Sequence, residues 1–190
     1  MRKLNYLLLF TTVLLTTNCG SKKTTNSQYG VKSTLPLSKE SLNPPNGVIS
    51  GWGQRESSKE YSAIERATNA ATVDLTKFFD QLVKSAWEEY TEDREINGKQ
   101  KFTSRGLTLI EGVVDRAVRG VRTHKRESYY NEEKDIYTAF VVVHLEYEKA
   151  LEDLKKAMRN DEILKQDFVF KQYKERATEN FEQMKSRRNY

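Results

Sequence analysis

The stretch IYTAFVVVHL, residues Ile136–Leu145, is the richest in β-branched and aromatic residues in the chain. These residue types favour extended backbone because their side chains pack well on a pleated surface. In a strand, alternate side chains point to the same face. The stretch therefore predicts a strand with one apolar face, formed by Tyr137, Ala139, Val141, Val143 and Leu145.

A predicted helix upstream supplies an apolar stripe for this face. Between Ser58 and Ala86, apolar residues recur at intervals of three and four, the spacing of one helix face. Ser57 and Glu60 have the spacing of a capping box, which would satisfy two backbone N–H groups at the start of the helix. Small residues at the start of the stripe predict a close approach to the neighbouring element, and larger residues at its end predict a wider space. The stripe consists of Ile64, Ala67, Ala71, Leu75, Phe78 and Leu82.

Two more strands are expected beside the first. Val48–Gly53 is typical of a short strand interrupted by glycines, which would permit a tight turn into the helix. Val118–Tyr130 alternates apolar with polar or basic residues, and a polar NEEKD segment separates it from Ile136–Leu145. Two strands joined in this way predict an antiparallel hairpin.

The region between the helix and the hairpin has weaker secondary-structure signals than its neighbours. Trp87–Arg105 is polar and contains Asn97-Gly98, a strong turn signal, so two modest strands flanking that turn are predicted. Leu107–Val118 fits either a short helix capped at Thr108–Glu111 or more strand. Periodicity alone does not choose between them.

These elements predict an α+β fold: an antiparallel sheet packed by one long helix over residues 47–146, followed by C-terminal amphipathic helices over residues 147–190. One helix would bury a line from Tyr147 to Met158. The helices would either pack on the exposed sheet face of their own domain, or the last one would dock on a partner protein or a second copy. The stripe of that last helix is formed by Phe170, Tyr173, Ala177, Phe181 and Met184.

The N-terminus, MRKLNYLLLFTTVLLTTNCG, has the order of a secretory signal: two basic residues, a short apolar run and a polar segment. The apolar run is shorter than the roughly 20 residues of a membrane-spanning helix. The segment ends in Cys19, the only cysteine, in a position that looks like a lipobox. Residues 1–18 would then be a lipoprotein signal peptide and Cys19 the acylated residue. Asn18 and the early Leu15 depart from the usual pattern, and ordinary cleavage that leaves a free thiol is the alternative.

Residues 19–46 are expected to form a flexible tether behind the acylated cysteine, partly ordered near Leu35–Leu42. The segment is rich in Ser, Thr, Asn and Lys and holds all three prolines of the chain. In the whole chain 31% of residues are charged, and the two signs are interleaved after Gly47, so the sequence has no footprint for nucleic acid. One cysteine allows no internal disulfide, so stability must come from packing.

Three groups of side chains are candidates for a chemical site. His124 and His144 could lie on adjacent strands, but a metal needs more ligands than two, so no metal is expected. The acidic run at Glu88–Glu95 (Glu88, Glu89, Glu92, Asp93 and Glu95) could hold a hard cation or supply paired carboxylates, although a solvated loop is the default. The functional interpretation of the basic series is binding of lipid phosphates or anionic glycans, with a solvated strand face as the default. It consists of Arg116, Arg119, Arg122, Lys125 and Arg126.

Gly51-x-Gly53 before a helix is too short for a dinucleotide fingerprint, which needs a third glycine where Glu56 stands. No nucleotide is therefore expected. The only non-protein group predicted is the covalent lipid on Cys19.

Four features follow one another over Gly47–Tyr147: the glycine-containing strand Ile49–Gly53, the alanine-rich helix ERATNAATVDLTKFF, the segment Ala117–Val121 and the valine-rich strand Tyr137–Leu145. In these features the chain resembles the LPP-twenty family of bacterial outer-membrane lipoproteins. The resemblance implies an acylated periplasmic or surface protein with structural or assembly roles, and no enzymatic activity.

The sequence thus predicts a lipid-anchored, non-catalytic cell-envelope protein that serves as a structural, interaction or assembly module. The outer membrane is favoured, on its periplasmic or surface face. A protein partner or self-association is expected besides the membrane. The alternative is an envelope hydrolase or glycan-binding enzyme that uses the acidic run at Glu88–Glu95.

Overall fold

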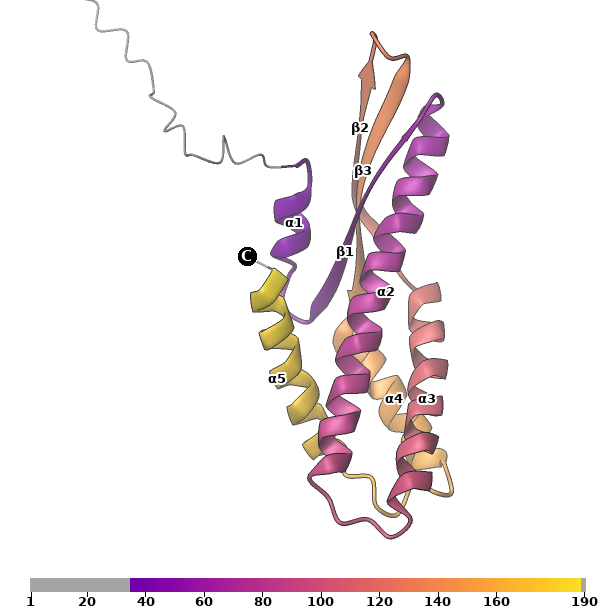
Figure 1. Ribbon diagram of the computed structural model, residues 1–190, viewed down its shortest axis with the longest axis vertical. Helices are drawn as coiled ribbons and strands as arrows, with labels where there is room; N and C mark the ends of the chain where they lie inside the picture. The colour runs from indigo at the N-terminus through magenta and orange to yellow at the C-terminus, as the bar shows by residue number, and fades with distance from the viewer. Residues whose placement is uncertain (1–34, 189–190) are drawn as a thin grey trace, which may run out of the picture. The chain divides into compact units, whose positions relative to one another are not determined.

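The computed structural model describes residues 35–188. They form an α+β fold in which a three-stranded antiparallel sheet is packed by one long helix and followed by C-terminal helices (Figure 1), which confirms the predicted fold class. No helix in this range is both long and apolar enough to cross a bilayer. In chain order the elements are α1 (Ser38–Leu42), β1 (Val48–Ser57), α2 (Glu60–Glu92), α3 (Lys99–Arg119), β2 (Arg122–Asn131), β3 (Ile136–Glu146), α4 (Tyr147–Asn160) and α5 (Phe170–Arg188).

The predicted apolar strand is the centre of the sheet. The strand order is β1-β3-β2, and β3 pairs antiparallel with both neighbours. The hairpin of β2 and β3 is therefore confirmed, with a bulge between Thr123 and Lys125. Ala139, Val141 and Val143 of β3 are buried in the main core. The alternating face predicted from the sequence is thus the face that meets the helix.

Helix α2 approaches the sheet closely at its start, as the small residues of its stripe predict. At its start, the backbone of α2 at Ala67 and Ala71 lies directly on β1, opposite Gly53 and Gly51. A Cβ atom at either glycine would come closer than 3.0 Å to this helix backbone. The glycines therefore lie inside a continuous ten-residue strand, where they permit close helix–sheet packing. The expectation that they form a turn into the helix was wrong.

The start of α2 also differs from the prediction. Lys59 is the N-cap and no side chain caps the helix, because Ser57 still belongs to β1 and pairs with Tyr137. The Ser57–Glu60 capping box is therefore not formed. At its other end α2 continues to Glu92, beyond the predicted end at Ala86.

The two strands predicted around Asn97-Gly98 are absent from the described structure, because the flanking segments are helical. Trp87 belongs to α2 and Phe102 to α3, and their buried rings stack with centroids 5.3 Å apart. The turn signal itself is real: Gly98 has φ +70° and joins the two helices. The helical alternative for Leu107–Val118 is confirmed, but α3 begins at Lys99 rather than at the predicted Thr108–Glu111 cap.

Helices α4 and α5 pack on other helices. Figure 1 shows α5 beside the second half of α2, and α4 close to α3. The expectation that they cover the exposed sheet face was wrong. They share the main core with α2. The 33 residues of α2 span about 50 Å, so this helix is long enough to pack on the sheet at one end and on the other helices at its other end.

The opposite sheet face carries a smaller apolar cluster. Leu37, which precedes α1, is buried there with Phe140 and Val142, and Trp52 packs against them. The Trp52 indole Nε1–H donates to the Pro36 carbonyl at 3.0 Å. The described end of the predicted tether is thus packed on the sheet, in line with the partial order expected near Leu35–Leu42.

Candidate functional site

The predicted lipid attachment residue, Cys19, lies outside the described residues, as do the signal peptide and the first part of the tether. The other residues singled out from the sequence all lie within residues 35–188, where their surroundings can be examined.

The stripe on α5 faces the interior of the protein. Tyr173, Ala177 and Phe181 are buried, and Phe170 and Met184 are partly buried against the same core. The Phe181 ring stacks on that of Tyr147 with centroids 5.2 Å apart. A partner protein would reach this stripe only if α5 moved away from α2.

The acidic run belongs mostly to a helix and not to a loop. Glu88, Glu89 and Glu92 are in the last turns of α2, Asp93 is its C-cap, and Glu95 follows in the connection to α3. The loop expectation was wrong because the segment continues the helix to complete the buried face that contains Trp87 and Tyr90. The carboxylates occupy the solvent-facing side of the same turns.

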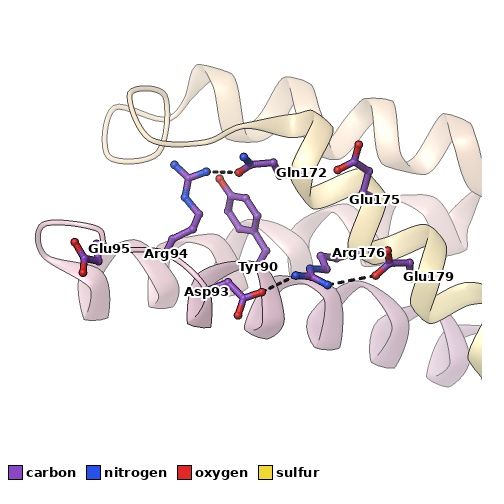
Figure 2. Close-up of a pocket in the computed structure, with 8 residues that line it drawn as sticks. All are labelled: Tyr90, Asp93, Arg94, Glu95, Gln172, Glu175, Arg176 and Glu179. Atoms are coloured by element: carbon purple, nitrogen blue, oxygen red, sulfur yellow. Dashed lines mark hydrogen bonds and ion pairs between the residues drawn. The ribbon is translucent and has the colours of Figure 1, made fainter.

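Two carboxylates of the run line a hollow of about 660 Å³ between α2 and α5 (Figure 2). Arg176 of α5 donates to Asp93 at 2.6 Å and to Glu179 at 3.4 Å. Arg94 donates to the Gln172 side chain at 2.6 Å. The hollow is lined by Tyr90, Asp93, Arg94, Glu95, Gln172, Glu175, Arg176 and Glu179.

These bonds join one helix to the other. Figure 2 shows Glu95 at the opposite end of the hollow from Glu175 and Glu179, while Asp93 turns toward Arg176. Glu89, outside the hollow, accepts a bond from the buried Asn180 side chain of α5 at 3.2 Å. Carboxylates of the run thus connect α2 to α5.

The two histidines do lie on adjacent strands. The ring of His124 on β2 is stacked on that of His144 on β3, with centroids 4.0 Å apart and planes 12° apart. Burial and the neighbouring His124 lower the pKa of His144. Its Nε2 atom is buried and has no hydrogen-bond partner within residues 35–188. That range contains no group of three or more His, Cys, Asp or Glu side chains placed to hold a metal ion.

The basic series is divided between two elements. Arg116 and Arg119 lie in the last turn of α3, where cations interact favourably with the negative end of the helix dipole. The other three residues lie on β2, where Lys125 pairs with Glu40 at 3.1 Å and Glu127 at 3.4 Å. The single strand face expected from the sequence is therefore wrong for the first two arginines.

Sequence reasoning did not anticipate a second hollow, where Arg116 and Arg122 meet Lys149 of α4 and His144. Its volume is about 430 Å³. Lys149 is one of many charged residues in an amphipathic helix, and no local signal distinguishes it. Only the packing of α4 beside α3 brings it to this place.

The two edges of the sheet differ. At β1, the backbone N–H of Trp52 donates to Asp74 at 3.1 Å, and the Ser50 carbonyl accepts from Arg188 at 2.9 Å. Strand β2 forms the other edge, and within residues 35–188 no hydrogen bond joins its outer backbone groups to another segment. None of its ten residues is buried. Within the described residues, side chains therefore bond to two outer backbone groups of β1, at Ser50 and Trp52, and to none of β2.

Comparison of the chain with protein-family models, with curated proteins and with solved structures found no match.

Proposed function

We propose that the protein is a lipid-anchored, non-catalytic lipoprotein of the cell envelope that acts as an interaction module, with β2 as its contact edge. The open edge of β2 is the observation that carries the interaction role. A long edge strand is a template for another strand, and addition of an extended segment to such an edge is a recurring mode of recognition. The anchor rests on the order of signal, Cys19 and tether in the sequence.

The partner we propose is an acidic, extended segment of another protein. Strand β2 carries Arg122, Lys125 and Arg126 against one carboxylate, Glu127. Two copies of β2 paired with each other would bring these cations together, which disfavours self-association through this edge. Tyr129 and Tyr130, 51% and 49% exposed, add aromatic surface of the kind that is enriched at interfaces.

A photoreactive residue placed at Tyr129 in the full chain, in cells, tests the contact edge. The matched control is the same residue at Tyr61, which is 77% exposed at the start of α2. We expect a discrete adduct at position 129 that is absent at position 61 and lost in Arg126→Glu. Peptide mapping should place the crosslink in an acidic segment of another protein. An adduct with twice the mass of the chain, or equal labelling at both positions, would contradict this assignment.

The anchor is tested by mass spectrometry of the mature N-terminus. We expect a chain that begins at Cys19 and carries acyl groups, and a Cys19→Ala variant that no longer fractionates with membranes, because two or more acyl chains make anchoring effectively permanent. An unacylated N-terminus in the native protein would show that the anchor proposal is wrong.

A further inference from the structure

The second hollow lies where α3 ends, β2 begins and β3 continues into α4. Three cations from three elements line it: Arg116 from α3, Arg122 from β2 and Lys149 from α4. Within residues 35–188, none of the three has a carboxylate oxygen within 4.0 Å. Elsewhere in the fold, Lys84, Arg105, Lys125, Lys174, Arg176 and Arg188 form such pairs.

We propose that this hollow binds the phosphate group of an anionic amphiphile of the glycerol-phosphate type. One arginine is enough to bind the two oxygens of a carboxylate in a bidentate way. Three cations that approach from separate elements suit a tetrahedral group, which presents oxygens in several directions. A phosphate diester or monoester is the common biological group of that kind.

The rest of the lining accounts for the other parts of the ligand. Val48, Ala117, Leu145 and Ala150 supply apolar surface beside the cations, where an acyl or alkyl portion would lie. Two carboxylates, Glu146 and Asp153, also line the hollow. With neutral His144, three cations and two anions leave a net charge of +1. The carboxylates would accept hydrogen bonds from hydroxyl groups next to the phosphate, as in a glycerol headgroup.

The first turn of α4 adds to the preference for an anion. The backbone N–H of Tyr147 is taken by the Gly47 carbonyl at 2.9 Å, but the other N–H groups of this first turn, which contains Lys149, still present the positive end of the helix dipole. On the opposite wall, the end of α3 presents negative carbonyls. One of them, at Ala117, is occupied because it accepts the Gly120 N–H at 2.9 Å. This proposal does not depend on the acyl anchor.

The test uses NMR of the imidazole groups in the full chain, which has only two histidines. His144 lines the hollow and His124 is stacked on it, so a ligand there should shift the His144 resonances. The probes are inorganic phosphate, glycerol 3-phosphate, a short-chain phosphatidylglycerol and a phosphatidylcholine with the same chains. We expect saturable shifts with phosphatidylglycerol, weaker binding of glycerol 3-phosphate, and the weakest binding of phosphate and phosphatidylcholine.

Variants of exposed cations assign the binding to the hollow. Arg116→Gln and Lys149→Gln should each weaken phosphatidylglycerol binding about tenfold, because each removes a charged hydrogen-bond donor. Arg119→Gln is the matched control, since Arg119 lies in the same last turn of α3 but does not line the hollow. The proposal would be overturned if Arg119→Gln lost as much affinity for phosphatidylglycerol as Arg116→Gln and Lys149→Gln. It would also be overturned if no probe gave a saturable shift, or if phosphatidylcholine bound as tightly as phosphatidylglycerol. Equal affinity for glycerol 3-phosphate and phosphatidylglycerol would overturn the amphiphile in favour of a free phosphate ester.

Discussion

Gly106 of α3 lies against the indole ring of Trp87 in α2, and a Cβ atom at Gly106 would come closer than 3.0 Å to three ring atoms. The indole is fully buried, and its Nε1–H donates to the Thr103 carbonyl at 3.0 Å, one turn before Gly106. The absence of a side chain at Gly106 therefore lets α2 and α3 meet at the helical end of the fold.

Gly106→Ala should destabilise the protein by about 1–3 kcal/mol, because the added methyl overpacks a rigid aromatic ring. Gly112→Ala is the control: in the same helix, the nearest atom to its new Cβ would be an arginine nitrogen at 3.7 Å. That change should raise stability by about 0.5–1 kcal/mol through its helix propensity alone. Urea denaturation of both variants measures the difference. Equal effects would show that the Trp87 contact does not limit packing.

Loss of the hydroxyl group from either of two buried tyrosines is expected to change the stability of the protein in opposite directions. The Tyr147 hydroxyl is buried with no hydrogen-bond partner in residues 35–188, and the Thr178 hydroxyl near it donates to the Lys174 carbonyl instead. The Tyr173 hydroxyl donates to the Val83 carbonyl at 3.2 Å. Burial raises the pKa of both hydroxyls, so both stay neutral.

Tyr147→Phe should therefore leave stability unchanged or raise it by about 1 kcal/mol, since it removes an unsatisfied polar group. Tyr173→Phe should lower stability by about 1 kcal/mol, since it removes a buried hydrogen bond to the Val83 carbonyl. Thermal and urea unfolding of the two single variants provide the comparison. A loss of stability in Tyr147→Phe as large as in Tyr173→Phe would mean that the Tyr147 hydroxyl has a partner in solution.

Arg188 closes the outer edge of β1. Besides the Ser50 carbonyl, it contacts Asp74 at 2.5 Å and lies over the Phe78 ring at 4.6 Å. Arg188→Gln should cost about 1 kcal/mol, a modest effect because the arginine is partly exposed. The Trp52 amide donates a hydrogen bond to the Asp74 carboxylate, and its hydrogen exchange should become faster. The control is Arg187→Gln, which should leave that amide unchanged because Arg187 forms no ion pair within residues 35–188.

The stacked histidines should make stability depend on pH. Since the folded-state pKa of His144 lies below its ordinary value of 6.5, the unfolded chain binds more protons between the two pKa values. The contribution of His144 is therefore complete above pH 6.5 and is lost as the pH falls toward the folded-state pKa. The pH dependence of urea unfolding between pH 8 and pH 5 measures this loss.

His144→Gln should flatten that dependence, because it removes the group whose proton affinity changes on folding. Five other charged side chains line the hollow with His144: Arg116, Arg122, Glu146, Lys149 and Asp153. An unchanged slope in His144→Gln would assign the pH dependence to another group.

Local patterns in the sequence were reliable where one residue type repeated on one face. The period-two run of β3 and the three–four stripe of α2 each predicted a buried face, and both faces are in the core. The pattern failed over Trp87–Arg105, because the polar residues on the helix surfaces there outnumber the few apolar residues that the helices bury. Trp87, Tyr90 and Phe102 are buried there, but their spacing crosses a turn and belongs to two helices.

Which residues form the candidate sites depended far more on tertiary packing than on local sequence patterns. The sequence alone determined that β3 is a strand, that α2 approaches β1 closely at its start, and that Cys19 is the only thiol, because these follow from residue identity and local periodicity. Only the tertiary structure decided that the α5 stripe is covered by its own chain, that β2 is left open, and that Arg116, Arg122 and Lys149 meet. Those outcomes depend on which exposed helix faces pack together, and many charged surface residues are equivalent until the packing selects a few of them.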